Sequence, residues 1–155
     1  MNSFKVSERD IMVSGRSIGS GPACHLAANF DPLCLILISP IKSVNHIARK
    51  ICGRLTDFLI EERFNNIEVV KTVKCPTAIL HGINDEIVDS EDSVDLLMKG
   101  FISSKTHLFL REKMRHNKFD YEHDLLRPLQ YFFYFHQIAF DLRNQQVFDF
   151  ELNPG

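Results

Sequence analysis

Short apolar runs alternate with helix-like segments along this chain, and this alternation restricts the fold more than any other feature. The stretches LCLILI (33–38) and TAILHG (77–82) each begin directly after a proline. An apolar run without polar alternation is typical of a strand that is covered on both faces of its sheet. A short apolar run over 11–14 and a weakly alternating one over 106–110 predict two further strands.

Helix-like segments lie between and after these strands. They fall at 18–29, at 42–59 as two short pieces broken near Gly53, within 63–74, at about 90–100 and at 123–140. Regular alternation of strand and helix predicts an α/β fold, with three α/β/α layers around a mostly parallel sheet. We expect one domain over residues 1–142 and a C-terminal tail over 143–155.

Two residue types indicate where the later helices begin. Ser90 or Ser93 is expected to cap the helix that ends at Gly100, because serine side chains satisfy free amides at helix starts. Pro128 falls inside the last helical segment. Because proline is tolerated in the first turn of a helix but not in its interior, the last helix is predicted to start or restart near Pro128.

Composition excludes several functional classes. The chain of 155 residues carries 18 Lys and Arg against 20 Asp and Glu, so no basic field for nucleic acid is expected. The polar start is unlike a signal peptide, and no apolar run approaches the roughly 18 residues of a membrane helix. Single cysteines predict small core residues in a reducing compartment, which favours the cytoplasm, although an even number also allows two disulfides. They are Cys24, Cys34, Cys52 and Cys75. No metal or other cofactor is expected.

The sequence GRSIG (15–19) places Ser17 between a predicted strand and a predicted helix. A nucleophile elbow has this pattern, G-x-S-x-G, in this context. Gly15 and Gly19 lie at positions that are expected to require a small residue such as glycine, because strand and helix approach closely there. The N–H group of Ile18 is a candidate donor to an oxyanion at the start of a helix. The pattern alone also fits an inactive turn that is rich in small residues.

A nucleophilic serine needs a base and an acid that orients the base. Asp85 follows the strand at 77–82, and His116 follows the strand at 106–110. Loops at the carboxyl edge of an open α/β sheet form its ligand site, so these side chains are expected near Ser17. Glu86 and Asp89 are competing carboxylates. Three other histidines are expected to have structural or exposed roles: His25, His81 and His107.

Four stretches give a more specific resemblance: GRSIGSGPACHLAA, LILISPIKSV, CPTAILHGINDEIVD and RHNKFD. Between about Val6 and Phe135, the sequence resembles the C-terminal half of an α/β-hydrolase. It is most similar to the serine-hydrolase branch that contains the α/β-hydrolase-domain depalmitoylases. The resemblance implies that Ser17 is the nucleophile, Asp85 the acid and His116 the base. The implied substrate is an acyl ester or a thioester of an acylated protein.

Two departures from the family accompany this resemblance. Met114 and Arg115 precede His116, where family members often have a glycine. The strands that precede the elbow in a complete domain have no counterpart, and a loop there supplies the second oxyanion donor. An apolar sheet edge without its neighbour invites pairing with another strand. The chain is therefore expected to be a piece of a longer protein, a domain completed by a partner chain, or a non-catalytic structural or interaction subunit.

The run YFFYFHQIAF (131–140) is the other conspicuous feature. Its expected role is a final helix that packs aromatic side chains on the sheet. Contact with a membrane surface, an acyl chain or a protein partner is the alternative interpretation.

Overall fold

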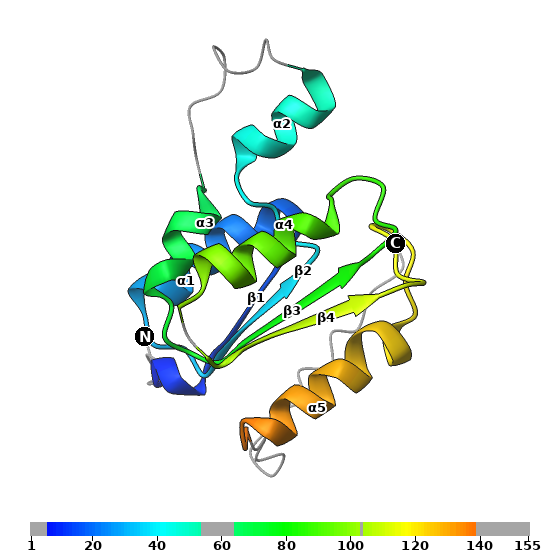
Figure 1. Ribbon diagram of the computed structural model, residues 1–155. Helices are drawn as coiled ribbons and strands as arrows, with labels where there is room; N and C mark the ends of the chain where they lie inside the picture. Colours follow the sequence, from blue (N-terminus) through cyan, green and yellow to red (C-terminus); the bar gives the residue numbers. More distant parts are fainter. Residues whose placement is uncertain (1–5, 54–63, 103, 139–155) are drawn as a thin grey trace, which may run out of the picture.

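Four parallel strands form the centre of the molecule. The structure, a computed structural model, describes residues 6–53, 64–102 and 104–138. The strands are β1 (Met12–Arg16), β2 (Cys34–Ile38), β3 (Thr77–Gly82) and β4 (Thr106–Arg111), and they lie side by side in this order. Every neighbouring pair is parallel, so all four carboxyl ends meet at one edge of the sheet (Figure 1). The predicted strands are thus confirmed.

Helices cover both faces of this sheet (Figure 1). One face carries α1 (Ser20–Asn29), α3 (Asn66–Val69) and α4 (Ser90–Asp95), while the other carries α5 (Arg127–Phe135). A short 3₁₀ turn, η2 (Ser17–Gly19), joins β1 to α1. The predicted three-layer α/β arrangement is therefore confirmed.

Alternate residues of the central strands build two apolar cores. Leu35 and Leu37 of β2 are fully buried in the core under α1, α3 and the π-helical turn η5 (Leu96–Gly100) that follows α4. Ile36 lies between them in the sequence and packs in the opposite core, around Phe132 of α5. Because both faces are covered, β2 has no polar alternation, as its sequence indicated.

The first residues of α4 and α5 test two predictions, of which one is wrong and the other is confirmed. Asp89 is the N-cap residue of α4, and neither Ser90 nor Ser93 caps this helix. Ser90 is already the first helical residue, while Ser93 is buried against β3. Before α5 lies a π-helical turn, η6 (Tyr121–Leu126), and Pro128 falls in the first turn of α5, where the restart was predicted.

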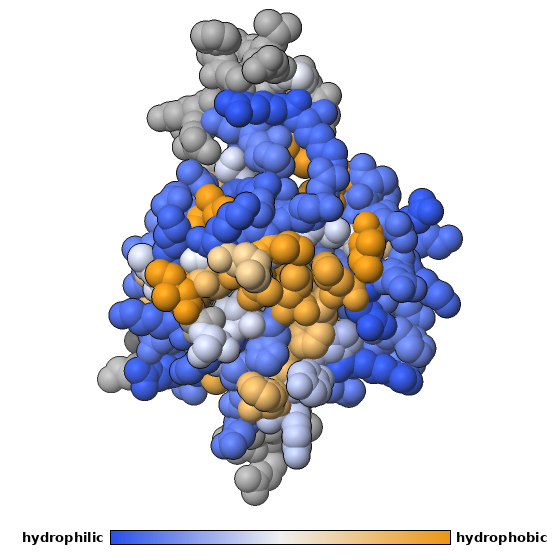
Figure 2. Space-filling view, viewed as in Figure 1, coloured by the Kyte–Doolittle hydropathy of each residue, from blue (hydrophilic) through white to orange (hydrophobic). Residues whose placement is uncertain are grey.

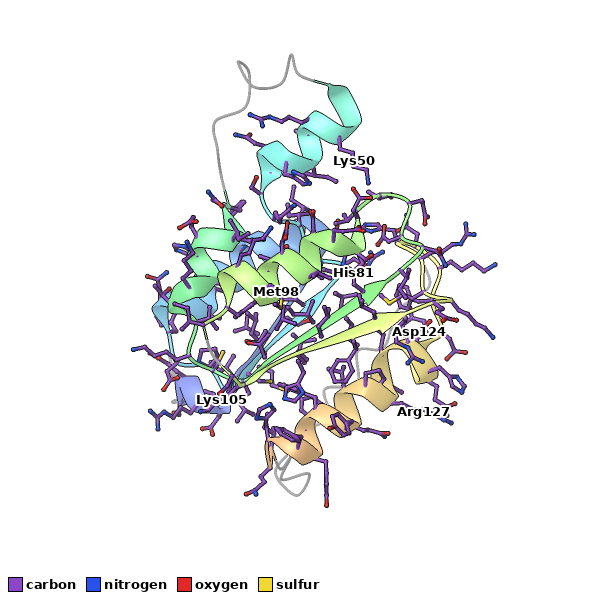
Figure 3. All side chains as sticks on the ribbon, viewed as in Figure 1. Lys50, His81, Met98, Lys105, Asp124 and Arg127 are labelled. Atoms are coloured by element: carbon purple, nitrogen blue, oxygen red, sulfur yellow. The ribbon has the colours of Figure 1, made fainter. Side chains whose placement is uncertain are left out.

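The helix α2 (Val44–Cys52) stands away from the sheet and is tied to α4 by charges (Figure 1). Lys50 points down from α2 in Figure 3, and its ammonium group lies 2.7 Å from the Asp89 carboxylate. Lys42, just before α2, pairs with Asp92 and Asp95. The helix ends at Cys52 with Gly53 as its C-cap residue. The second helix predicted before residue 59 lies outside the described residues, as do residues 139–155.

Three cysteines have the core role expected of them. Cys24, Cys34 and Cys75 are free and buried, and the Cys52 side chain lies outside the described part. Burial raises the pKa of the Cys24 and Cys34 thiols to about 12 and that of Cys75 to about 11. In the described segments, none of the helices has the length and apolarity needed to span a membrane.

Candidate active site

Ser17 occupies a strained turn at the carboxyl end of β1. Its φ of 52° lies in the left-handed region, which costs a non-glycine residue about 1–3 kcal/mol. A buried hydroxyl fixes this turn, because Ser20 Oγ donates to the carbonyl oxygen of Ser17 at 2.6 Å. Asn66 Nδ2 in turn donates to Ser20 Oγ at 3.1 Å, so α3 supports the same turn. The conformation of Ser17 is therefore set by the surrounding fold.

The two glycines of the turn, Gly15 and Gly19, differ in how much space a side chain would have there. A Cβ atom at Gly15 would lie 2.5 Å from the carbonyl oxygen of Gly19 and 2.6 Å from Cβ of Ala23. A Cβ atom at Gly19 would meet no atom of the described residues within 4 Å. The expected close approach of strand and helix is confirmed at Gly15 and is wrong for Gly19, because helix α1 reaches β1 through Ala23.

Asp85 lies in the loop after β3 and is almost completely buried. Its carboxylate accepts hydrogen bonds from the amides of Ile87 and Val88, each at 2.9 Å. Burial alone would raise the pKa of Asp85, but these amides and His116 outweigh it and hold the pKa below its usual value. Both competing carboxylates, Glu86 and Asp89, are exposed and outside this arrangement.

His116 faces Asp85 across the edge of the sheet. Its Nδ1 atom lies 2.9 Å from Oδ2 and 3.1 Å from Oδ1 of Asp85, and only 5% of the residue is exposed. Because a carboxylate only accepts hydrogen bonds, Nδ1 carries the proton, which leaves Nε2 as the basic nitrogen. Ser17, Asp85 and His116 each follow a different strand, so all three lie at the carboxyl edge of the sheet.

The loop that carries His116 runs directly over the end of β3. A Cβ atom at Gly82 would lie 2.0 Å from the carbonyl oxygen of Met114, so only glycine permits this path. Met114 is fully buried at the contact, while Arg115 is exposed. The substitution of Met114 and Arg115 for the family's glycine therefore does not prevent His116 from reaching Asp85.

Arg16 connects the elbow to the same loop. Its Nη2 atom donates to the carbonyl oxygen of His116 and, at 2.9 Å, to Oδ1 of Asn117. Its guanidinium carbon lies 5.7 Å from the ring centre of Phe119. Nothing in the sequence indicates this residue, because the second position of G-x-S-x-G has no required side chain.

Within the described residues, no hydrogen bond links Ser17 Oγ to His116. Such a bond between nucleophile and base is often long in the absence of substrate.

His81 has a structural role, as expected. It is fully buried between β3 and α4 (Figure 3), where Nε2 lies 3.1 Å from the Val88 carbonyl and Nδ1 lies 2.6 Å from Ser93 Oγ. A carbonyl only accepts, so Nε2 carries the proton and Nδ1 accepts from Ser93. Its Nε2 atom also lies 3.5 Å from Oδ2 of Asp85, so His81 supports the loop that holds the acid.

Two of the other histidines have surroundings unlike a catalytic site. His107 belongs to an aromatic cluster with Phe135 and His136, at ring-centre distances of 4.8 and 4.9 Å. His25 is exposed on α1. Among the described residues, no group of three or more His, Cys, Asp or Glu side chains has the arrangement of a metal site.

The topology and the loop positions define the class of protein: the chain has an α/β-hydrolase fold. Its backbone superposes on the esterase domain of a Rhodothermus marinus protein with a TM-score of 0.60 and 15% identity, over 81% of this chain and 59% of that one. No family model matches the chain.

Comparison with curated proteins confirms the expected resemblance to α/β-hydrolase-domain proteins. The chain is 37% identical over 93 residues to α/β hydrolase domain-containing protein aho-3 of Caenorhabditis elegans, a match covering 60% of this chain and 27% of that protein. It is 29% identical over 86 residues to human α/β hydrolase domain-containing protein 17B, covering 56% and 29%. The chain thus spans less than a third of the length of the curated relatives it matches.

Proposed function

We propose that the protein is a serine hydrolase that cleaves acyl esters or thioesters. The observation that carries this proposal is the buried pair of Asp85 and His116, with Nδ1 and Oδ2 2.9 Å apart. This pair leaves His116 Nε2 as a base on the side of the sheet where Ser17 stands on its strained turn. Base and orienting acid are what a serine hydroxyl needs to become a nucleophile.

In the proposed reaction, Ser17 Oγ attacks the acyl carbon while His116 Nε2 takes the hydroxyl proton. Asp85 holds the imidazole through Nδ1 and stabilises the imidazolium that forms. The Ile18 amide follows Ser17 directly and donates to the negatively charged oxygen of the tetrahedral intermediate. His116 then returns its proton to the leaving alcohol or thiol, and water attacks the acyl-enzyme by the same route.

The surroundings of the elbow favour an apolar acyl group. The Ile18 side chain is 61% exposed directly beside the nucleophile. A long acyl chain would cover this side chain and remove it from water. A thioester of a lipidated protein is the substrate that we propose within this class, and the cytoplasm, near a membrane surface, is the proposed compartment.

Labelling with a fluorophosphonate probe tests the proposal on the protein expressed from its complete coding sequence. We expect covalent labelling of wild type and its loss in Ser17→Ala. Ser104→Ala is the matched control, because Ser104 is exposed in the turn before β4, at the amino ends of the strands and so away from the site. Labelling that is absent from wild type, or that persists in Ser17→Ala, would contradict the proposal.

A further inference from the structure

Arg16 is the residue through which the elbow holds the His116 loop. Three interactions run from its guanidinium group to that loop, to the His116 carbonyl, the Asn117 side chain and the Phe119 ring. A planar, always charged guanidinium suits this combination, because it donates in its plane and stacks on an aromatic face. Lysine offers only a compact charge at such a site.

The remaining contacts of the loop lead to other parts of the fold. Asn84, after β3, donates to the Glu112 carbonyl at 2.8 Å, and Met114 packs on Gly82 at the end of β3. The Asp85 carboxylate, which holds the imidazole, also belongs to the β3 loop. Within the described residues, the hydrogen bonds between the elbow (15–19) and the loop (112–119) all come from Arg16.

Two separate tethers therefore locate the imidazole. Asp85 fixes the rotation of the ring relative to β3, while Arg16 fixes the backbone of His116 relative to β1. Because Arg16 and Ser17 are joined by one peptide bond, a tether from Arg16 also sets the distance between Ser17 and His116. Displacement of reacting groups by about 1 Å can cost roughly 100-fold in rate.

We propose that Arg16 is a positioning residue that holds His116 within reach of Ser17. The proposal rests on the proposed hydrolase function for its effect on rate, but not for its effect on the loop. Loss of the guanidinium should let the loop move away from the elbow without exposing the cores, because Arg16 itself is exposed.

The first test measures the rate of Ser17-dependent fluorophosphonate labelling in Arg16→Gln and Arg16→Lys. We expect a fall of roughly 10- to 100-fold in Arg16→Gln, a smaller fall in Arg16→Lys, and partial recovery of Arg16→Gln by added guanidinium ion. Arg115→Gln is the matched control, since it removes a guanidinium from an exposed position of the same loop. Equal labelling rates in wild type and Arg16→Gln would overturn the proposal.

The second test measures backbone amide exchange over residues 112–119, which needs no activity. We expect faster exchange there in Arg16→Gln than in Arg115→Gln, with an unchanged midpoint of thermal unfolding. Faster exchange in a protein that the probe does not label would support the tether and reject the hydrolase function. Unchanged exchange, with or without labelling, would reject the tether; if Arg16→Gln does not fold, Arg16→Lys decides both tests.

Discussion

At the residue scale, the protonation of His81 is set by its partners on both ring nitrogens. Burial lowers the pKa of His81, and this effect exceeds the opposing influence of the Val88 carbonyl and of the Asp85 and Asp92 carboxylates. The side chain is therefore neutral in the fold over a wider pH range than in the unfolded chain, where its pKa is near the ordinary 6.5. Loss of this neutral form would disturb the loop that carries Asp85.

A pH-dependent stability follows from this shift. As the pH falls below about 6.5, the unfolded chain binds a proton at His81 that the folded chain does not, so stability is lost with falling pH. His81→Gln should be less stable than wild type at neutral pH but should lose less stability on acidification. The slope should decrease by up to about 1.4 kcal/mol per pH unit, measured by urea unfolding below pH 6.5.

His25→Gln is the matched control, because His25 is exposed on α1. Its stability should keep the acid dependence of wild type. An equal change of slope in the two variants would mean that the buried environment of His81 is not the cause.

The sequence was sufficient to predict that Asp85 and His116 lie together, but not to identify the residues that support them. The order of serine, acid and histidine, each after a strand, follows from the connectivity of the fold. Ser93 instead fits the pattern of a helix cap, since a serine near a helix start has that local role. Its actual partner, His81, is 12 residues away, and Arg16 and His116 are 100 apart. Such pairings depend on how the loops pack in space.

At the element scale, the approach of α1 to β1 determines which elbow glycine is indispensable. Gly15→Ala should destabilise the protein by about 1–3 kcal/mol, because its Cβ atom would overlap the Gly19 carbonyl and Ala23. Gly19→Ala should change stability by less than about 1 kcal/mol, because Gly19 has a helical φ of −63° and open space around it. Chemical denaturation measures both, and equal losses would contradict the close contact of β1 with α1 at Gly15.

The strands were the most predictable elements and the ends of the helices the least. The two-faced burial of β2 and β3 leaves a continuous apolar signal, so their positions were found within about a residue. The turn after α4 and the turn before α5 are π-helical, at η5 (Leu96–Gly100) and η6 (Tyr121–Leu126). Local periodicity does not distinguish such turns from α-helix, because they are rare and only about one turn long.

At the scale of the whole molecule, the sheet has two edge strands within the described residues, β1 and β4. Apolar side chains gather on the visible face between α4 and α5, where β4 forms the front edge (Figure 2). The β1 edge is also apolar: Ile11 and Met12 are each more than 40% exposed. Beside them, Leu26, Phe30 and Pro32 help to line a hollow of about 320 Å³.

An apolar edge of this kind is expected to pair with another strand. The N–H and C=O groups on the outer side of β1 are free to accept a further strand in the described sheet, and burial of the adjacent apolar side chains would stabilise the pairing. A lysine in an edge strand opposes such pairing through its charge. Met12→Lys should therefore reduce concentration-dependent association of this chain, measured by light scattering coupled to size-exclusion chromatography.

Met98→Lys is the matched control for that measurement. Met98 is 74% exposed on η5, which lies beside β4, the edge strand opposite to β1, and its replacement makes the same change of side chain. If association proceeds along β1, Met98→Lys should associate as wild type does, while Met12→Lys should remain monomeric at the same concentration. Equal relief by both variants would indicate association through general apolar surface, and a wild-type chain that stays monomeric at all concentrations would show that the β1 edge does not pair.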